Sequence, residues 1–414
     1  MKDLSNVMSS YRFTLISSAA PLGALNEAIK QIEAKFDYQL SVEVFLTHLI
    51  QQQAVSIEKV LDSMQRADAV LFDLRGNPDC AVRCVQEGYA RTAAQNTPFI
   101  PVFGGGPTVL KLLRMGSFKL EHVMERMGGS PDRQETLQMS TNYRRIKQVN
   151  QVVEKLGSFL PVGMLRHARN WVRCTQYWTN SGVGNLREML LFVAHEYAGV
   201  DVDARPPDIY PEDGFYDVSS RRFFEDLQSY LDFQQLQDHL PTILVILYGG
   251  TTLDACVTGA REFLTALSSR ANVLHFFADG ISTTQALELH LLENGKPRLP
   301  VDAIVSLQWF PLEGGPLGGK PEITHELLAR IGAPLYTAVT SYNRTLDDWR
   351  LSPQGVSPVE TLASVTLPEM DGAIDPVYLF GLKDLADTAP TGAATEPAPG
   401  RGRHLAERVL ARIR

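Results

Sequence analysis

The sequence predicts an α/β protein with two doubly wound parallel-sheet lobes joined by a helical region. Two long stretches, one in each half of the chain, alternate short apolar runs with segments of helical periodicity. A series of this kind builds a parallel sheet with right-handed crossovers. Between the two series, apolar residues recur at helical spacing only. At 414 residues, the chain is also too long for one ordinary core, which favours more than one domain.

Four apolar runs of the first series are predicted to be strands, at residues 11–18, 39–46, 67–74 and 98–103, with helices at 22–34, 56–64 and 80–94. The corner Gly104-Gly105-Gly106-Pro107 follows the last strand. It resembles a phosphate loop, but we interpret it as a turn because it lacks the Lys-Ser/Thr pair of that motif. We assign residues 1–114 to an N-terminal α/β domain.

Residues 115–240 are predicted to form a helical middle region. One apolar stripe runs from Tyr143 to Leu156 and a second from Leu186 to Tyr197, both at the spacing of a helix with one buried face. The segment 201–216 carries three prolines and is expected to be an irregular crossing.

The second α/β domain, residues 241–385, is organised around the stretch from Leu240 to Ala260. Residues 242–248 are a β-branched run typical of a strand covered on both faces. Gly249 and Gly250 allow a tight turn, and Thr251 or Thr252 can cap the helix that follows. Backbone N–H groups at such a helix start can hold an anion or a cofactor edge. Most junctions of this kind only turn the chain.

Three more strands are expected in this domain, at residues 272–277, 303–307 and 333–339. The carboxyl edge of the sheet would then gather Gly249-Gly250, Asp279-Gly280, the loop 310–320 and Ser341-Tyr342-Asn343. Ligands of open α/β sheets bind at this edge. In the loop, Gly314 and Gly315 belong to a glycine-rich run that indicates close backbone approach, a lid, or a long flexible loop.

The end of the chain changes composition. Residues 386–402 are rich in Pro, Ala and Gly and are predicted to be a linker. Residues 403–414 form a basic amphipathic stretch, the start of a further helix, which we expect to have little to pack on within this chain. The sequence is therefore interpreted as the front part of a longer protein.

Charge, composition and motifs argue against several classes of function. A net charge of −8 without a long basic run argues against a nucleic-acid groove. No segment has the length of an apolar membrane span and no signal sequence is visible, which predicts a cytoplasmic protein. The four cysteines lack a Cys-x-x-Cys pair and are expected to be reduced. His195-Glu196 begins like a zinc-protease motif, but Gly199 stands where the second histidine belongs.

Three carboxylates, Glu369, Asp371 and Asp375, lie close together in the segment LPEMDGAIDP. Oxygen ligands of this kind can hold a hard cation. A turn whose solvated acids cap neighbouring amides is the favoured alternative.

Several segments together resemble the large subunit of the ATP-dependent tetrapyrrole metal chelatases, the family of the magnesium-chelatase and cobaltochelatase large subunits. They are LRMGSF at 113–118, QYWTNSGVGNLREMLL at 176–191, VDAIVSLQWFPLEGGP at 301–316 and LPEMDGAIDP at 367–376. The first two, and the stretch ENGKPRLPVDAIVSL at 293–307, look closer to the magnesium branch. The chain departs from the family at Tyr216-Asp217-Val218 and at Gly249-Gly250.

The resemblance implies a subunit that binds a porphyrin or corrin ring and a divalent metal, magnesium or cobalt, while AAA+ ATPase subunits use ATP to drive insertion. It implies the front portion of a magnesium chelatase of (bacterio)chlorophyll biosynthesis, a ligase that forms nitrogen–metal bonds. The insertion domains and other C-terminal chelatase domains are expected outside this chain. The alternatives are a cobaltochelatase subunit of cobalamin biosynthesis or a truncated, non-catalytic tetrapyrrole-binding protein.

No catalytic base and no metal ligand is assigned. We nominate a cleft edge that would contact the ring, formed by Gly249, Gly250, Thr251, Gly314, Gly315, Glu369, Asp371 and Asp375. A rival from another class, an α/β sensor that resembles periplasmic binding proteins, is disfavoured by the missing signal sequence.

Overall fold

The computed structural model describes residues 10–18, 20–36, 39–74, 79–104, 106–126, 162–249, 252–280, 282–383 and 395–413. The chain divides into two compact units, Met1–Ile209 with Thr388–Gly392 and Tyr210–Asp387 with Ala393–Arg414. The predicted apolar stripe from Tyr143 to Leu156 lies outside the described residues. The predicted limits at residues 114 and 240 stay a prediction.

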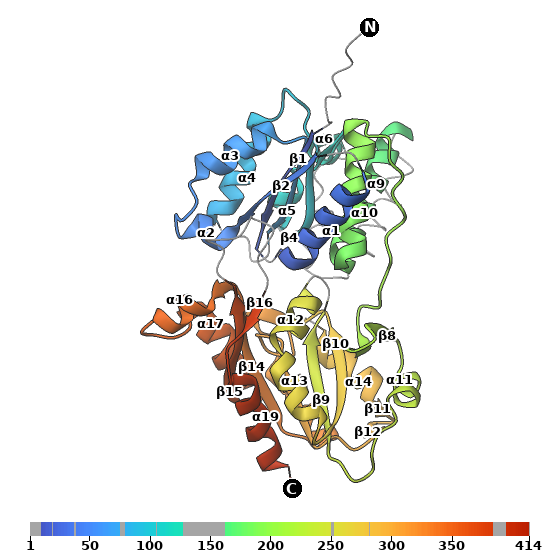
Figure 1. The fold of residues 1–414 in the computed structure, drawn as a ribbon, viewed down its shortest axis with the longest axis vertical. Coiled ribbons are helices and arrows are strands. Elements are labelled where there is room, and N and C mark those ends of the chain that lie inside the picture. The colour runs from blue at the N-terminus through green and yellow to red at the C-terminus, as the bar shows by residue number, and fades with distance from the viewer. Residues whose placement is uncertain are drawn as a thin grey trace. The chain divides into compact units, whose positions relative to one another are not determined.

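The first unit contains a six-stranded sheet in the order β2-β1-β3-β4-β5-β6 (Figure 1). Its parallel strands are β1 (Ser10–Ser17), β2 (Gln39–Leu46), β3 (Ala69–Leu74) and β4 (Phe99–Gly104). The four strands predicted from the apolar runs are thus confirmed. The short strands β5 (Arg114–Met115) and β6 (Phe118–Lys119) add an antiparallel hairpin at one edge.

Helices cover both faces of the first sheet (Figure 1). One core contains residues of α1 (Leu22–Lys35), α9 (Val162–Asn180) and α10 (Gly182–Ala198). The other contains residues of α3 (Ile57–Arg66) and α4 (Asp79–Arg91). The short helices α2 (Thr47–Gln51), α5 (Gly106–Leu110) and α6 (Leu120–Arg126) connect these elements. The second predicted apolar stripe therefore forms the buried face of α10, and this helix belongs to the first unit.

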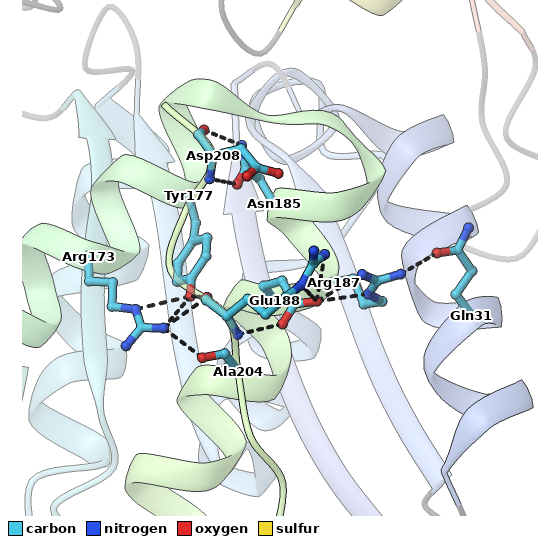
Figure 2. Close-up of polar contacts among 9 residues, drawn as sticks. Gln31, Arg173, Tyr177, Asn185, Arg187, Glu188, Ala204 and Asp208 are labelled. Atoms are coloured by element: carbon cyan, nitrogen blue, oxygen red, sulfur yellow. Dashed lines mark hydrogen bonds and ion pairs between the residues drawn. The ribbon is translucent and has the colours of Figure 1, made fainter. Parts of the chain in front are cut away.

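A polar network fixes the irregular segment after α10 to the helices beneath it (Figure 2). Glu188, which is 6% exposed, accepts a hydrogen bond from the backbone N–H of Arg205 at 2.8 Å. Burial works against the charged form of Glu188, but the Arg205 N–H and the Arg187 guanidinium outweigh burial and lower its pKa. The other bonds of the network join Asn185 to Asp208, Arg173 to Ala204, Tyr177 to the Arg205 carbonyl, and Arg187 to Gln31 of α1.

Replacing Glu188 with alanine is expected to lower the free energy of unfolding of the first unit by about 2 kcal/mol, because buried hydrogen bonds to a charged group are lost. Limited proteolysis should then cut residues 199–209 faster than in the original protein. Glu188→Gln keeps the acceptor oxygen and should give an intermediate rate. Equal cleavage rates for all three proteins would show that this network does not hold the segment.

The second unit contains an eight-stranded sheet in the order β16-β15-β14-β13-β9-β10-β7-β8. Its five parallel strands are β9 (Thr242–Tyr248), β10 (Asn272–Ala278), β13 (Ala303–Ser306), β14 (Leu335–Thr345) and β15 (Ala373–Leu382). The first four of these strands confirm the prediction, and β15 was not predicted. Antiparallel strands flank them, namely β7 (Gly214–Asp217), β8 (Arg222–Phe224) and β16 (Thr395–Pro397). β16 lies in the segment expected to be a linker.

Both faces of the second sheet are also covered. On one face lie α12 (Leu253–Gly259), α13 (Arg261–Ser268) and α19 (Arg401–Arg412). On the other lie α11 (Leu227–Gln234), α14 (Thr283–Leu291) and α15 (Pro321–Ile331). The hairpin β11 (Leu292–Glu293) and β12 (Lys296–Pro297) follows α14. The β14–β15 connection contains α16 (Leu346–Leu351), α17 (Pro358–Thr361), a π-helical turn (Leu362–Thr366) and α18 (Leu367–Met370).

The expectation that the last helix has little to pack on is wrong. Leu405 and Val409 of α19 are 0% exposed and belong to the same core as Phe263 of α13. Arg408 and Arg412 also form ion pairs with Asp375 of β15, at 2.5 and 2.9 Å. The sequence showed the apolar face of this helix but not its partner.

Among the residues that the structure describes, no helix combines the length and the apolar character needed to cross a membrane.

Candidate functional site

The candidate site lies at the carboxyl edge of the second sheet, where β9, β10 and β13 end side by side because they run parallel. Gly249 follows β9 and donates its N–H to the carbonyl of Ala278 at the end of β10, at 3.0 Å. A Cβ on Gly249 would lie 3.0 Å from that carbonyl oxygen. The glycine therefore permits close contact between two strand ends. Gly250 and Thr251, which were nominated with it, lie outside the described residues.

Three aromatic side chains gather beside Gly249. The ring of Phe310 is 1% exposed and makes edge contacts with Tyr248 and Trp309, both with 5.1 Å between ring centroids. Tyr248 and Trp309 are partly exposed. Gly280 has a φ of +85°, and a Cβ there would lie 2.5 Å from Phe310 and 3.1 Å from Tyr248. A glycine is needed at this position for the aromatic group to pack as it does.

Several polar side chains lie next to the aromatic rings, at the start of α14. Thr283 donates its hydroxyl to Gln308 Oε1 at 3.1 Å, and Thr284 donates its hydroxyl to Glu313. A single antiparallel bridge also joins the backbones of Ser282 and Glu313. The loop after β13 is therefore fastened to the N-terminus of α14 by both its backbone and its side chains.

The glycine-rich loop is a compact turn in which the backbone approaches itself closely. Gly314 and Gly315 have φ values of +81° and +70°, which favour glycine. A Cβ on Gly314 would lie 2.5 Å from the backbone of Gly318 and Gly319. Of the interpretations that the sequence left open, close backbone approach is the one that describes this conformation.

The three carboxylates of LPEMDGAIDP lie in different surroundings. Asp371 is 2% exposed and accepts the N–H of Leu312 at 2.8 Å, Asp375 pairs with Arg408 and Arg412 of α19, and Glu369 is exposed on α18. Within the described ranges, no group of three or more His, Cys, Asp or Glu side chains could hold a metal ion. Asp371 thus fastens the base of the loop after β13 to the segment before β15.

Asp371 should make stability depend on pH. Burial raises its pKa to about 6, although the Leu312 N–H opposes that rise. The folded state then holds a proton that the unfolded state releases, so this group's contribution to stability is lost as the pH rises from about 4 to about 6. Asp371→Asn removes the titration. Relative to this variant, the original protein should lose up to about 3 kcal/mol of unfolding free energy between pH 4 and pH 7.

Urea unfolding of the original protein and of Asp371→Asn at the two pH values measures this difference. Glu369→Gln serves as the control, because it removes a carboxylate at an exposed position of the same segment. A difference between the original protein and Asp371→Asn that stays constant from pH 4 to pH 7 would contradict the burial of this carboxyl group.

Sequence reasoning nominated the glycines and acids of this edge but missed Tyr248, Trp309 and Gln308. The two aromatic residues stand at the end of a strand and at the start of a loop, which the alternation of strands and helices had already located. Their position at this edge of the predicted sheet was therefore a signal from which the sequence could have identified them. The pairing of their rings through Phe310 depends on contacts between distant segments, and sequence periodicity does not report such contacts.

Residues 175–414, more than half of the chain, match the protein family described as CobN/Magnesium Chelatase. Residues 18–172 match a domain of unknown function, DUF3479. The chain is similar to a magnesium-chelatase subunit of Rhodobacter capsulatus, with 29% identity over 259 residues that cover 61% of this chain and 21% of that protein. The chloroplastic magnesium-chelatase subunit ChlH of Oryza sativa is 24% identical over 301 residues, which cover 68% of this chain and 21% of that protein.

Among solved structures, the chain is similar to the catalytic subunit of cobaltochelatase from Mycobacterium tuberculosis. The TM-score is 0.49 and the sequence identity is 17%, over 96% of this chain and 26% of that subunit. The chain spans about a fifth of the length of the two curated relatives described above.

Proposed function

This chain belongs to the CobN/magnesium chelatase family, and from that premise we propose that it binds a tetrapyrrole ring at the carboxyl edge of its second sheet. The observation that carries the proposal is the group of Tyr248, Trp309 and Phe310 at that edge, within the part of the chain that matches the family. A flat macrocycle requires an apolar surface on which it can stack. Aromatic side chains supply a large apolar area with a defined stacking geometry.

We further propose that the chain acts as the front portion of a magnesium-chelatase large subunit in (bacterio)chlorophyll biosynthesis. Relatives named as magnesium-chelatase subunits support the choice of metal. Insertion of cobalt into a corrin ring is the second candidate, because the description of the matched family covers CobN as well. Release of the two pyrrole protons needs a base, which we assign to no residue of this chain. A cytoplasmic location stays a prediction.

The proposed partners are AAA+ ATPase chelatase subunits, which would use ATP to drive insertion, and the remaining C-terminal chelatase domains. In this scheme, the chain supplies the surface that holds one face of the ring, and the metal is a substrate. The nominated residues Gly249 and Gly314 shape the backbone of this surface, while Asp371 fixes the loop that carries Trp309 and Phe310 at its start.

A titration followed by absorbance tests the proposal. The purified chain is mixed with protoporphyrin or with hydrogenobyrinic diamide, and the main absorbance band of each ring is recorded. We expect a shifted, saturable band with protoporphyrin and a weaker response with the corrin precursor. The reverse order would favour the cobalt candidate. An unchanged spectrum with both rings would contradict tetrapyrrole binding by this chain.

A further inference from the structure

We propose that the N-terminus of α14 is a subsite for a carboxylate side chain of the ring, and that the Glu313 carboxylate occupies this subsite until the ring displaces it. The inference rests on the proposed function, because it assumes that a macrocycle stacks beside Tyr248 and Trp309. Tetrapyrroles of biosynthesis carry carboxylate side chains at their rim. The subsite would therefore select rings by their charge, while the aromatic surface accepts any flat ring.

The start of α14 offers donors to an anion. The helix has nine residues, carries no acidic side chain in its first turn, and begins after Ser282, whose side chain makes no capping hydrogen bond. The first N–H groups of a helix and its dipole favour a negative charge at this end. Two carboxylates lie at this end: Asp279 accepts the N–H of Ser282 at 3.1 Å, and Glu313, from another segment, accepts the hydroxyl of Thr284.

Gln308 adds a donor that the internal carboxylate leaves unused. Its side chain is 0% exposed, and its Oε1 accepts from Thr283 at 3.1 Å, which places the amide group beside the first turn of α14. In the part of the chain that the structure describes, Gln308 Nε2 has no hydrogen-bond partner. A buried amide donor without an acceptor costs stability, and such a group in a folded protein calls for an explanation. A ligand carboxylate would supply the missing acceptor.

When the Glu313 carboxylate leaves α14, the backbone bridge between Ser282 and Glu313 still holds the loop. The Cγ of Glu313 packs against Gly319, where a Cβ would lie 2.7 Å away, and the residue is partly exposed. The preceding residue, Leu312, stays fixed because its N–H is bonded to Asp371. The base of the loop can thus remain in place while the Glu313 side chain turns away.

The subsite and the aromatic surface are adjacent. Gly280 lies against both Phe310 and Tyr248, and the helix cap Ser282 follows two residues later. On the other side, Gln308 directly precedes Trp309 and Phe310 in sequence. A ring stacked on the partly exposed aromatic side chains would bring its rim to the first turn of α14.

Paired ligands separate the two parts of the proposal. Deuteroporphyrin carries two carboxylates, and its dimethyl ester has the same ring without the charges. Dissociation constants for both are measured with the full 414-residue chain and with two variants, Glu313→Ala and Gln308→Leu. Glu322→Ala is the matched control, because it removes one exposed carboxylate from the first turn of α15. Circular dichroism compares the folding of all three variants with that of the original protein.

We expect the original chain to bind the acid more tightly than the ester. Glu313→Ala should strengthen binding of the acid by about 5-fold, since the internal competitor is gone, and leave the ester unchanged. Gln308→Leu should weaken binding of the acid by about 5-fold and spare the ester. Glu322→Ala should behave as the original chain does with both ligands.

Equal affinity for acid and ester in the original chain, with no selective effect of Glu313→Ala, would overturn the carboxylate subsite while ring binding stands. An equal gain for the acid in Glu313→Ala and Glu322→Ala would also overturn it, because net charge alone would then explain the gain. If neither ligand binds to any of the proteins, the proposed function itself fails. If Gln308→Leu is unfolded, the acid-to-ester ratio of the original chain and of Glu313→Ala still decides.

Discussion

Replacing Trp309 with alanine is expected to weaken ring binding by about 30-fold. This factor corresponds to about 2 kcal/mol, the contribution of one large aromatic side chain that becomes buried against a ligand. The Trp309 carbonyl accepts the Ser364 hydroxyl at 2.8 Å, and its ring rests on Phe310. The backbone and the neighbouring ring thus hold the indole in position before the ligand arrives. Titration of the variant with deuteroporphyrin measures the change.

Phe233→Ala is the matched control for this substitution. Phe233 is an aromatic residue of α11 that is 43% exposed and packs against Phe224, with 5.1 Å between ring centroids. Phe224 belongs to β8, an edge strand that β9, β10 and β7 separate from β13. Phe233→Ala therefore removes exposed aromatic surface away from the candidate site. We expect an unchanged dissociation constant for this variant. Equal weakening by the two substitutions would indicate non-specific adsorption of the ring to aromatic surface.

Replacing Leu405 with alanine is expected to lower the free energy of unfolding of the second unit by about 2–5 kcal/mol, the usual cost of shortening a fully buried leucine. Leu405 is 0% exposed in the core between α13, α19 and the sheet. Gly402 on the same helix lies so close to α13 that a Cβ would be 2.6 Å from the Phe263 nitrogen. The helix therefore has little room to readjust around a cavity.

Urea unfolding followed by circular dichroism measures this loss, and Glu407→Ala serves as the control on the same helix. Glu407 is exposed, so its substitution should change the unfolding free energy by less than about 0.5 kcal/mol. If Leu405→Ala and Glu407→Ala unfold at the same urea concentration, α19 is not part of the packed core of the second unit.

The sequence predicted the parallel strands well where burial is continuous. Residues 242–248 coincide with β9 and residues 39–46 with β2, because a run of apolar or alternating residues reports burial directly. The strand β15 was missed because Asp375 and Pro376 interrupt its apolar run near the start. The charge of Asp375 is compensated by Arg408 and Arg412 of α19, which lie in a later segment. Local patterns do not show such long-range compensation.

The candidate site was predicted in part. The glycines at the ends of β9 and of the loop after β13 were visible because turns of this kind need particular backbone angles. Asp371 was expected in a solvated turn or at a cation, but it is buried against Leu312. Gln308 gave no signal at all, because its importance depends on a missing partner in the folded chain. The resemblance to the chelatase family is confirmed by the family match over residues 175–414.

Hydrogen–deuterium exchange of the full chain, with and without deuteroporphyrin, tests most directly whether the ring binds at the carboxyl edge of the second sheet. We predict slower exchange on ring binding in peptides that contain Tyr248-Gly249, the start of α14 and residues 308–316. Peptides from α11 and from the hairpin β11–β12 should be unaffected. Ring binding that leaves exchange at residues 308–316 and at the start of α14 unchanged would contradict the proposed site.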